Sequence, residues 1–181
     1  STLGIKSGYT IVDGVGADMS GNYNVTATAT VTGTINKADL TITAATDSKT
    51  YDGNTSSVGT PTVTAGTVFS GDNLSGLSQS FGSKNVMGTG LSTLSVGTGY
   101  TLNDGNSGGN YNVVLANASG TITKADLTLT PVSDSKTYDG TVNSTAVATV
   151  TGKASSDTVT VAEEFASKNV MGANGSTLGI K

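Results

Sequence analysis

The stretch LTITAATDSKTYDG, at residues 40–53, decides how this chain is organised. Apolar and hydroxyl side chains alternate at Leu40–Thr43, and the stretch ends in Tyr-Asp-Gly, a sequence typical of a tight turn. The same order returns as LTLTPVSDSKTYDG at residues 127–140, with an offset of 87 residues. A strand signal and a turn signal that recur together indicate a repeated β-unit.

Three further motifs recur in the same order, and their offsets of 84 to 88 residues change only across Gly/Ser-rich stretches. They are Gly33–Asp39 with Gly120–Asp126, Gly21–Val25 with Gly109–Val113, and Ser83–Gly88 with Ser167–Gly172. The unit therefore has about 87 residues. We predict one complete repeat at residues 40–126, flanked by the C-terminal half of a repeat at residues 1–39 and the N-terminal half of another at residues 127–181.

The two ends of the chain carry the same six residues, Ser1–Lys6 and Ser176–Lys181. Joining the two half repeats at this overlap makes one whole unit. We therefore expect the chain to be a window on a longer array. The alternative is that separate chains meet head to tail, each completing the other's half domain; both predict exposed sheet edges that favour association.

Composition favours a β-rich fold over disorder. Thr, Gly, Ser and Asn make up more than half of the chain, and apolar residues are scarce, but net charge is low and the apolar residues follow a period of two. We predict strands at Tyr23–Thr32, Leu40–Ile42, Leu127–Leu129 and Thr158–Val161. We expect tandem immunoglobulin-like β-sandwiches in an elongated rod, with a β-grasp-like fold as the alternative.

The sequence at the junctions between repeats predicts that successive repeats are stiffly connected. Apolar side chains fall on odd positions at Ile35 but on even positions at Leu40, so the inward face changes across Asn36-Lys37; Ile122 and Leu127 repeat this change. A last strand then continues into the next first strand with only Lys-Ala-Asp between them. Such a joint has much less slack than a Gly/Ser linker.

The residues that are missing exclude several functions. The chain has no His, Cys, Trp or Arg, which removes thiol nucleophiles, imidazole acid–base pairs, disulfides and soft-ligand metal sites. The net charge of −4 and the lack of a Lys-rich run argue against nucleic-acid partners. No apolar run is long enough to span a membrane. We predict no catalytic residues, no cofactor and no metal site.

Several motifs allow a chemical and a structural interpretation, and the structural one is favoured for each. Tyr51-Asp52-Gly53 and Tyr138-Asp139-Gly140 could be acid sites, but Asp beside Gly is typical of turns. Lys84-Asn85 and Lys168-Asn169 suggest an isopeptide crosslink or, more simply, a solvated turn. The loops Asp104–Asn110, Asp13–Asp18 and Gly71–Asn73 could hold Ca²⁺, although they lack the dense Asp spacing and terminal Glu of a strong calcium loop.

Three more sets of residues complete the candidates. A glycan platform could use Tyr9, Tyr23, Tyr100 and Tyr111. However, Tyr23 and Tyr111 fall on the positions of the alternating pattern that are expected to face the core. A glycosidase could use Glu163-Glu164, but neighbouring strand residues face opposite sides. The Asn-x-Ser/Thr triplets at Asn24, Asn54, Asn73, Asn117, Asn143 and Asn174 are close to what so much Ser and Thr produces by chance.

Four motifs resemble the YDG-type repeats, also grouped with the MBG repeats, of large bacterial surface proteins such as the filamentous haemagglutinin-like adhesins of two-partner secretion. The motifs are Ser48–Gly53, Phe81–Val86, Gly109–Tyr111 and Gly120–Ala125, with their counterparts Ser135–Gly140, Phe165–Val170, Gly21–Tyr23 and Gly33–Ala38. The resemblance implies tandem modules in adhesin stalks, filaments and biofilms, on the bacterial cell surface and outside the cell.

We therefore expect a non-catalytic structural and adhesive module whose partners are neighbouring copies of the same repeat. The alternative function is a module that binds glycans or matrix polymers, with or without Ca²⁺.

Overall fold

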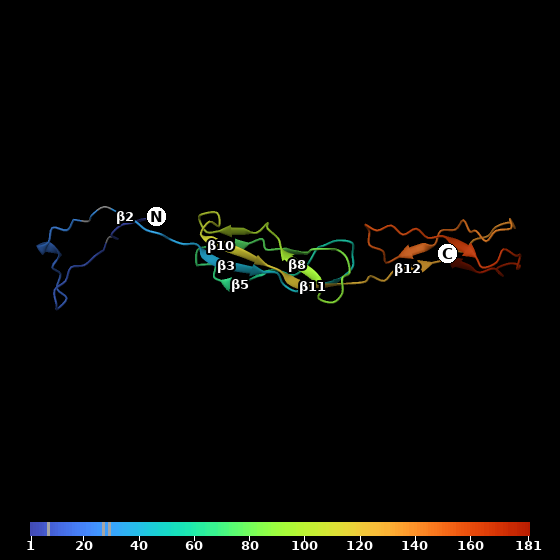
Figure 1. Cartoon of the computed structure of the whole chain (residues 1–181), viewed down its shortest axis with the longest axis horizontal. Coiled ribbons are helices and arrows are strands. Elements are labelled where there is room, and N and C mark those ends of the chain that lie inside the picture. The colour runs from blue at the N-terminus through green and yellow to red at the C-terminus, as the bar shows by residue number, and fades with distance from the viewer. Residues whose placement is uncertain (7, 27, 29) are drawn as a thin grey trace. The chain divides into compact units, whose positions relative to one another are not determined.

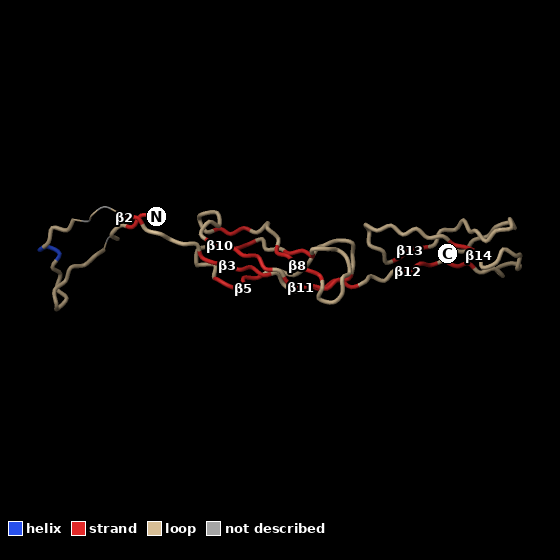
Figure 2. Tube along the Cα trace, in the orientation of Figure 1, coloured by secondary structure: helices blue, strands red, loops and turns tan. Residues whose placement is uncertain are grey.

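The computed structural model describes residues 1–6, 8–26, 28 and 30–181. Within these residues the regular elements are β-strands and one short 3₁₀ helix, η1 (Ser20–Asn22), as Figures 1 and 2 show. The fold divides into one unit at residues 1–38 and another at residues 39–181. The all-β class predicted from the period of two is confirmed.

The central segment, residues 40–126 together with the start of its first strand, contains nine strands. They are β3 (Ala38–Thr43), β4 (Asp47–Thr50), β5 (Thr62–Gly66), β6 (Asn73–Ser75), β7 (Gln79–Phe81), β8 (Ser92–Val96), β9 (Thr101–Asn103), β10 (Tyr111–Ala116) and β11 (Ala118–Thr123). The strand orders are β10-β3-β5, β4-β11-β8-β7 and β6-β9. The pair β4–β11 is parallel, and the pairs β7–β8 and β8–β11 are antiparallel.

The core of the central segment joins two of these sheets. Ile42 on β3 packs in one cluster with Phe81 on β7, Leu94 on β8 and Ile122 on β11. All four side chains are almost completely buried. Because strand side chains alternate between faces, the Thr and Ser residues between them point outward and the apolar residues meet between the sheets.

The C-terminal segment, residues 127–181, contains four strands: β12 (Thr128–Thr130), β13 (Thr149–Thr151), β14 (Glu163–Phe165) and β15 (Leu178–Ile180). β14 pairs with β15 so that Phe165 lies opposite Leu178. In the central segment Phe81 lies opposite Leu94 in the same way. The repeated sequence therefore builds the same strand pair twice, in the same register.

The N-terminal segment, residues 1–39, pairs β1 (Thr2–Leu3) with β2 (Val31–Thr32), which places Leu3 opposite Val31. In the central segment Leu94 lies opposite Ala118, two residues before the Gly-Thr-Ile motif, and Val31 also lies two residues before that motif. The pair β1–β2 thus reproduces the register of β8–β11.

Two strand predictions are wrong in extent. Of the described residues at 23–32, only Val31–Thr32 pair as a strand, and Ala27 and Ala29 lie outside the described residues. The counterpart of this stretch, β10, pairs with β3, and residues 1–37 include no counterpart of β3. Leu40–Ile42 lies within β3, as predicted, and Leu127–Leu129 is shifted by one residue to β12.

The predicted strand at Thr158–Val161 is not formed. Its counterpart in the central segment, β6, pairs with β9, and residues 127–181 contain no counterpart of β9. Alternation by itself predicted a strand here, but a strand also needs a neighbour to accept its backbone hydrogen bonds.

The core prediction for the tyrosines is half right. Tyr111 is buried, whereas Tyr23, which occupies the same place in the Gly-Asn-Tyr motif, is exposed. Tyr111 packs against Phe69 and its hydroxyl donates to Asp72, and residues 1–39 do not repeat the loop that carries these two residues. Within the described parts of the chain, no helix is long and apolar enough to cross a membrane.

Candidate interaction site at the repeat junction

The motif Lys-Thr-Tyr-Asp-Gly forms a bend that its lysine holds together. The ammonium of Lys49 lies 2.8 Å from Asp52 Oδ1 and donates to the backbone oxygen of Asn54 at 2.9 Å. It also lies 5.6 Å from the centre of the Phe81 ring. Half-buried lysine stems pack along apolar surface while the charge stays solvated or paired, so Lys49 connects the bend to the core.

The C-terminal segment repeats this arrangement. Lys136 lies 2.9 Å from Asp139 Oδ1, donates to the backbone oxygen of Thr141 at 2.9 Å and lies 5.5 Å from the centre of the Phe165 ring. Asp139 is therefore engaged with a cation and with its own backbone. Its ion pair with Lys136 and its hydrogen bonds from Thr141 lower its pKa to about 2.

Both Tyr-Asp-Gly sequences have the geometry expected of turns. Asp52 Oδ1 accepts a hydrogen bond from the backbone N–H of Asn54 at 3.1 Å, and Gly53 has φ +82°. In the second motif, Gly140 has φ +77°. Glycine adopts these dihedral angles without the strain that a Cβ introduces.

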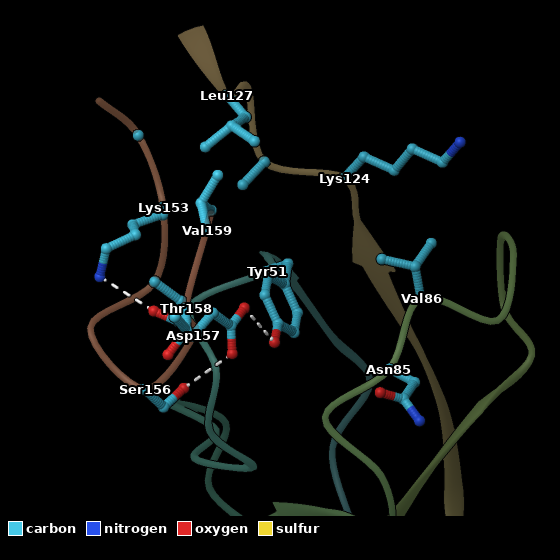
Figure 3. Close-up of a pocket in the computed structure, with 13 residues that line it drawn as sticks. Tyr51, Asn85, Val86, Lys124, Leu127, Lys153, Ser156, Asp157, Thr158 and Val159 are labelled. Atoms are coloured by element: carbon cyan, nitrogen blue, oxygen red, sulfur yellow. Dashed lines mark hydrogen bonds between the residues drawn. The ribbon is translucent and has the colours of Figure 1, made fainter. Parts of the chain in front are cut away.

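The two tyrosines of the motifs differ in their contacts. The hydroxyl of Tyr51 donates to Asp157 Oδ2 at 2.8 Å, which connects the central segment to the C-terminal segment (Figure 3). The Ser156 hydroxyl donates to Asp157 Oδ1 at 3.1 Å, and Lys153 donates to the Asp157 backbone oxygen at 2.9 Å. Tyr138 is exposed.

The two glycines of the motifs differ in the same way. A Cβ added at Gly53 would collide with Ser156 Oγ and lie 3.1 Å from the Ala154 side chain. A Cβ added at Gly140 would meet nothing within 4 Å. Gly53 is therefore required both by its backbone angle and by the close approach of the loop at residues 153–157, whereas Gly140 is required by its angle alone.

The Ser-Lys-Asn-Val motif lies at the same junction. Ser83 Oγ accepts a hydrogen bond from the Asn85 backbone N–H at 3.1 Å, which makes a local turn, and the Lys84 ammonium lies 4.0 Å from Asp157 Oδ1. In the second copy, Ser167 Oγ accepts from the Asn169 N–H at 3.2 Å. The structure thus gives the Lys-Asn pairs a turn role in both copies.

The polar groups of the junction stabilise one another. The hydrogen bond from Tyr51 lowers the pKa of Asp157 below its ordinary value, and Ser156 and two lysines act in the same direction. The same bond, together with burial, raises the pKa of Tyr51 above its ordinary value. Hence the junction is built from a protonated phenol and an ionised carboxylate.

Beside this hydrogen bond lies an open pocket of about 700 Å³. Tyr51, Asn85 and Val86 line it from the central segment, and Leu127 and Val159 line it from the C-terminal segment (Figure 3). The lining is mixed: polar and charged side chains, among them Lys124, Lys153 and Asp157, stand beside the apolar ones. It is wide enough to hold a small ligand, and the carboxylate of Asp157 at its wall is already engaged by Tyr51 and Ser156.

The loops considered for Ca²⁺ use their carboxylates locally. Asp104 accepts hydrogen bonds from the backbone N–H groups of Asn106, Gly108 and Asn110 at 2.7–2.8 Å. Asp13 accepts from Val15 and Ala17 at 3.0 and 2.9 Å. These oxygens organise their own loops, and no group of three His, Cys, Asp or Glu that could hold a metal ion occurs in the part of the chain that the structure describes.

Asp72 has a structural partner. Its Oδ2 accepts a hydrogen bond from the Tyr111 hydroxyl at 2.5 Å. Asp157 occupies the corresponding position in the C-terminal segment, 85 residues later, where Tyr51 is its donor. Of the other candidate tyrosines, Tyr100 packs against the core and Tyr9 is exposed.

The two glutamates face different environments, as expected of neighbours on a strand. Glu163 is buried and its Oε1 accepts from the Val132 N–H at 2.9 Å, while its Oε2 has no hydrogen-bond partner. Glu164 Oε2 lies 3.6 Å from the Lys181 ammonium. They do not share a site.

Sequence reasoning missed the loop at residues 153–157 as a contact of the Tyr-Asp-Gly motif. The available signal was Asp157, which follows two small residues as Asp72 does and precedes the same Thr/Asn-apolar-polar pattern. Its partner was not predictable, because Tyr51 lies 106 residues away in the sequence.

Comparison with protein families gives one match, to a family described as YDG domain, at residues 36–120 and again at residues 123–180. Comparison with curated proteins and with solved structures gives no match.

Proposed function

Because the chain belongs to the YDG domain family, we propose that it is a structural and adhesive module in which successive repeats support one another without catalysis. The proposed repeats are immunoglobulin-like sandwiches, with the complete one at residues 40–126 and half repeats at residues 1–39 and 127–181. Their partners are neighbouring repeats of the same array. The proposed location is outside the cell, on a bacterial surface.

One observation carries this proposal: the Tyr-Asp-Gly motif of one repeat contacts the next repeat. Tyr51 donates to Asp157, and Gly53 lies against Ser156 so closely that a Cβ would not fit. Between them β11 ends at Thr123 and β12 begins at Thr128. A short connection combined with a side contact restricts bending far more than a flexible linker does, and a stalk needs that restriction.

The surface composition agrees with such a role. Thr and Ser occupy the exposed positions of the strands, where hydroxyl groups hydrate the sheet and Thr favours the extended backbone. The resemblance to repeats of bacterial surface adhesins supports the extracellular location and the role in adhesion.

The junction is tested by the motion of its two sides. In the 181-residue chain, ¹⁵N relaxation should give one rotational correlation time for residues 40–123 and 128–181. Tyr51→Phe removes the hydrogen bond to Asp157 and should separate the two values. Tyr138→Phe is the matched control and should leave them equal, because Tyr138 is exposed. Two separate values in the unchanged chain would contradict a stiff junction.

The location is tested on intact bacterial cells that produce the protein. Brief treatment with a lysine-specific protease should release peptides of this chain while cytoplasmic proteins stay intact. Recovery of these peptides only after lysis would contradict a surface location.

The second candidate function is binding of glycans or matrix polymers, and the open pocket beside Tyr51 favours it. A glycan array probed with and without Ca²⁺ should then show signals that Val159→Gln, at the pocket wall, reduces. An array without signal at high protein concentration would exclude this candidate.

A further inference from the structure

The first and last strands of the central segment lie side by side. β4 pairs in parallel with β11, so that Asp47 lies opposite Gly120 and Thr50 opposite Thr123. β3, which directly precedes β4, is hydrogen-bonded to β10, which directly precedes β11. Two stretches of chain, β3–β4 and β10–β11, are therefore neighbours in both sheets. We call these two stretches the terminal pair.

The contacts along the terminal pair advance in the same direction on both stretches. Asn112 Nδ2 donates to Asp39 Oδ1 at 2.9 Å, the Ala44 N–H donates to the Ala116 oxygen at 2.9 Å, and the Tyr51 N–H donates to the Thr123 oxygen at 2.8 Å. Because the residue numbers of both partners rise together, the two stretches run parallel from the start of β3 to the end of β11. The pairing does not reverse where the strands pass from one sheet to the other.

Buried side chains connect the terminal pair to the rest of the core. Ile42 on β3 and Ile122 on β11 are 0% and 1% exposed and belong to the same cluster. The strands also approach closely at Gly120, where a Cβ would lie 2.7 Å from the Phe81 ring and 2.9 Å from the Asp47 backbone oxygen. Sliding one stretch past the other would therefore break backbone hydrogen bonds and also pull two isoleucines out of the core.

The chain enters and leaves the central segment at opposite ends of the terminal pair. Residues 1–37 precede β3, and residues 124–181 follow β11, which Figure 1 shows at the other end of the central segment from β3 and β10. Tension along the chain pulls the first stretch by its N-terminal end and the last stretch by its C-terminal end. In parallel strands these two forces oppose each other along the strands, so they shear the pair. Shear loads the hydrogen bonds between the strands together, whereas peeling from one end breaks them one after another.

We propose that the terminal pair is a mechanical clamp by which the repeat resists tension along the chain. The resistance comes from the direction of the load, since the same hydrogen bonds are weak when they are opened from one end. This inference goes beyond the proposed function because it assigns the load-bearing element inside one repeat. It does not rest on the surface location or on the hydrogen bond between Tyr51 and Asp157.

Pulling the same fold in two directions tests the clamp. The chain has no cysteine, so engineered pairs of cysteines define the two points at which single molecules of the 181-residue chain are held in optical tweezers. Lys37→Cys with Lys124→Cys loads the terminal pair in shear. Lys37→Cys with Ser107→Cys pulls on the neighbouring N-terminal ends of β3 and β10 and peels the pair; all three positions are exposed. At the same loading rate, we expect the unfolding force to be at least about twofold higher in shear.

The length of chain released identifies the segment that unfolds. Residues 37 and 124 are 87 apart in the sequence, and residues 37 and 107 are 70 apart. Complete unfolding between the anchors should therefore release about 300 Å in shear and about 240 Å in peeling. Both variants should keep the thermal midpoint of the unchanged chain, because the cysteines replace exposed side chains outside the strands. Equal forces in the two directions, or a lower force in shear, would overturn the proposal.

A matched pair of core variants gives an independent measurement in the shear direction. Ile122→Val and Leu102→Val each remove one carbon from a buried side chain, the first inside the clamp and the second outside it on β9. Separation of the terminal pair should limit unfolding under load, so Ile122→Val should raise the unfolding rate at constant force about fivefold. Leu102→Val should change this rate by less than about twofold, because its contacts are still present when the pair separates. Equal acceleration by both variants would contradict a clamp at the terminal pair.

Failure of the clamp is distinguishable from failure of the proposed stalk function. The three anchors lie within or directly beside the central segment, so the force comparison does not depend on whether residues 128–181 tumble with it. Two correlation times in the ¹⁵N relaxation experiment would contradict the stiff junction and leave the clamp intact. Equal unfolding forces in shear and in peeling would remove the clamp and leave the junction intact.

Discussion

The central segment and the C-terminal segment begin with nearly the same residues and reach different degrees of order. Leu40 and Ile42 are fully buried on β3, whereas their counterparts Leu127 and Leu129 are exposed and half-buried. The strand β3 lies between β5 and β10, while β12 has β13 as its neighbour. The difference teaches that burial of the first strand depends on the strands that lie beside it, above all on β10, which returns from the end of the repeat.

The largest effect should come from removing a core leucine on one side of this comparison. Leu94→Ala deletes a fully buried side chain and should destabilise the central segment by about 3 kcal/mol. Leu3→Ala changes the corresponding position of the N-terminal segment, where the side chain is 58% exposed, and should cost less than about 0.5 kcal/mol. Residue-resolved hydrogen exchange measures both. Equal costs would mean that Leu3 is as well covered as Leu94.

The next largest effect should come from two buried side chains at corresponding positions of the two segments. They are Gln79 on β7 and Glu163 on β14. Gln79 donates from Nε2 to the Ala45 backbone oxygen at 2.9 Å and to Ser57 Oγ at 2.8 Å. Glu163 Oε1 accepts from the Val132 N–H, but its Oε2 is buried without a partner. We therefore expect Gln79→Glu to destabilise by about 2 kcal/mol and Glu163→Gln to stabilise by about 1 kcal/mol.

Urea unfolding of the two variants measures these changes, and Glu164→Gln is the control. Glu164 pairs only with the partly exposed Lys181, so its substitution should change the free energy of unfolding little. A loss of stability in Glu163→Gln would show that the carboxylate has a role the amide cannot fill.

The third effect isolates the junction. Gly53→Ala and Gly140→Ala both place a Cβ on a residue with positive φ, which costs about 1 kcal/mol. Gly53→Ala must also displace Ser156, whereas Gly140→Ala enters open space. The first variant should therefore lower the melting temperature more than the second. If the two decreases are the same, the loop at residues 153–157 does not press on Gly53 in solution.

The smallest effect is the dependence on pH. The pKa values of Asp134 and Asp139 are lowered from 3.8 to about 2, Asp134 by hydrogen bonds from Ser144 and Thr145 and Asp139 by Lys136 and Thr141. A depressed pKa means that the stabilisation is present above the unfolded value and is lost as the pH falls through the folded value. The melting temperature should thus decrease as the pH falls from about 4 to about 2.

Because both carboxylates are solvent-accessible, the decrease should be modest. Asp139→Asn should make it smaller, since one of the groups with a strongly lowered pKa is then absent. A melting temperature that falls already between about pH 7 and pH 5 would point to a different group.

Local patterns predicted the features that depend on neighbours in the sequence. The bends at Asp52 and Asp139 follow from Asp-Gly chemistry, and β3 follows from the alternation at Leu40–Thr43. The same alternation was misleading at Tyr23–Thr32 and at Thr158–Val161, because each of these stretches lacks the strand that its counterpart pairs with. A period of two in the apolar residues shows that a segment is able to form a strand. Whether the strand forms depends on a neighbouring strand that completes its backbone hydrogen bonds.

For the candidate site too, the sequence predicted the local features and not the contact between distant residues. Sequence repetition marked Tyr51-Asp52-Gly53 and Ser83–Val86 as the residues to inspect, but it interpreted them as turns and did not connect them. The structure places both beside the loop at residues 153–157, where Tyr51 meets Asp157. No local signal encodes this contact, since its two residues lie in different repeats.

The sequence by itself determined the β class and the unit of about 87 residues, because these depend on alternation, turn residues and recurrence along the chain. Only the tertiary structure decided which copies of a residue are buried, which Asp-Ser-Lys-Thr becomes a strand and which Tyr-Asp-Gly meets a neighbour. The physical reason is that apolar burial and backbone hydrogen bonds are completed between segments far apart in the sequence, so identical residues take different states according to the strand beside them.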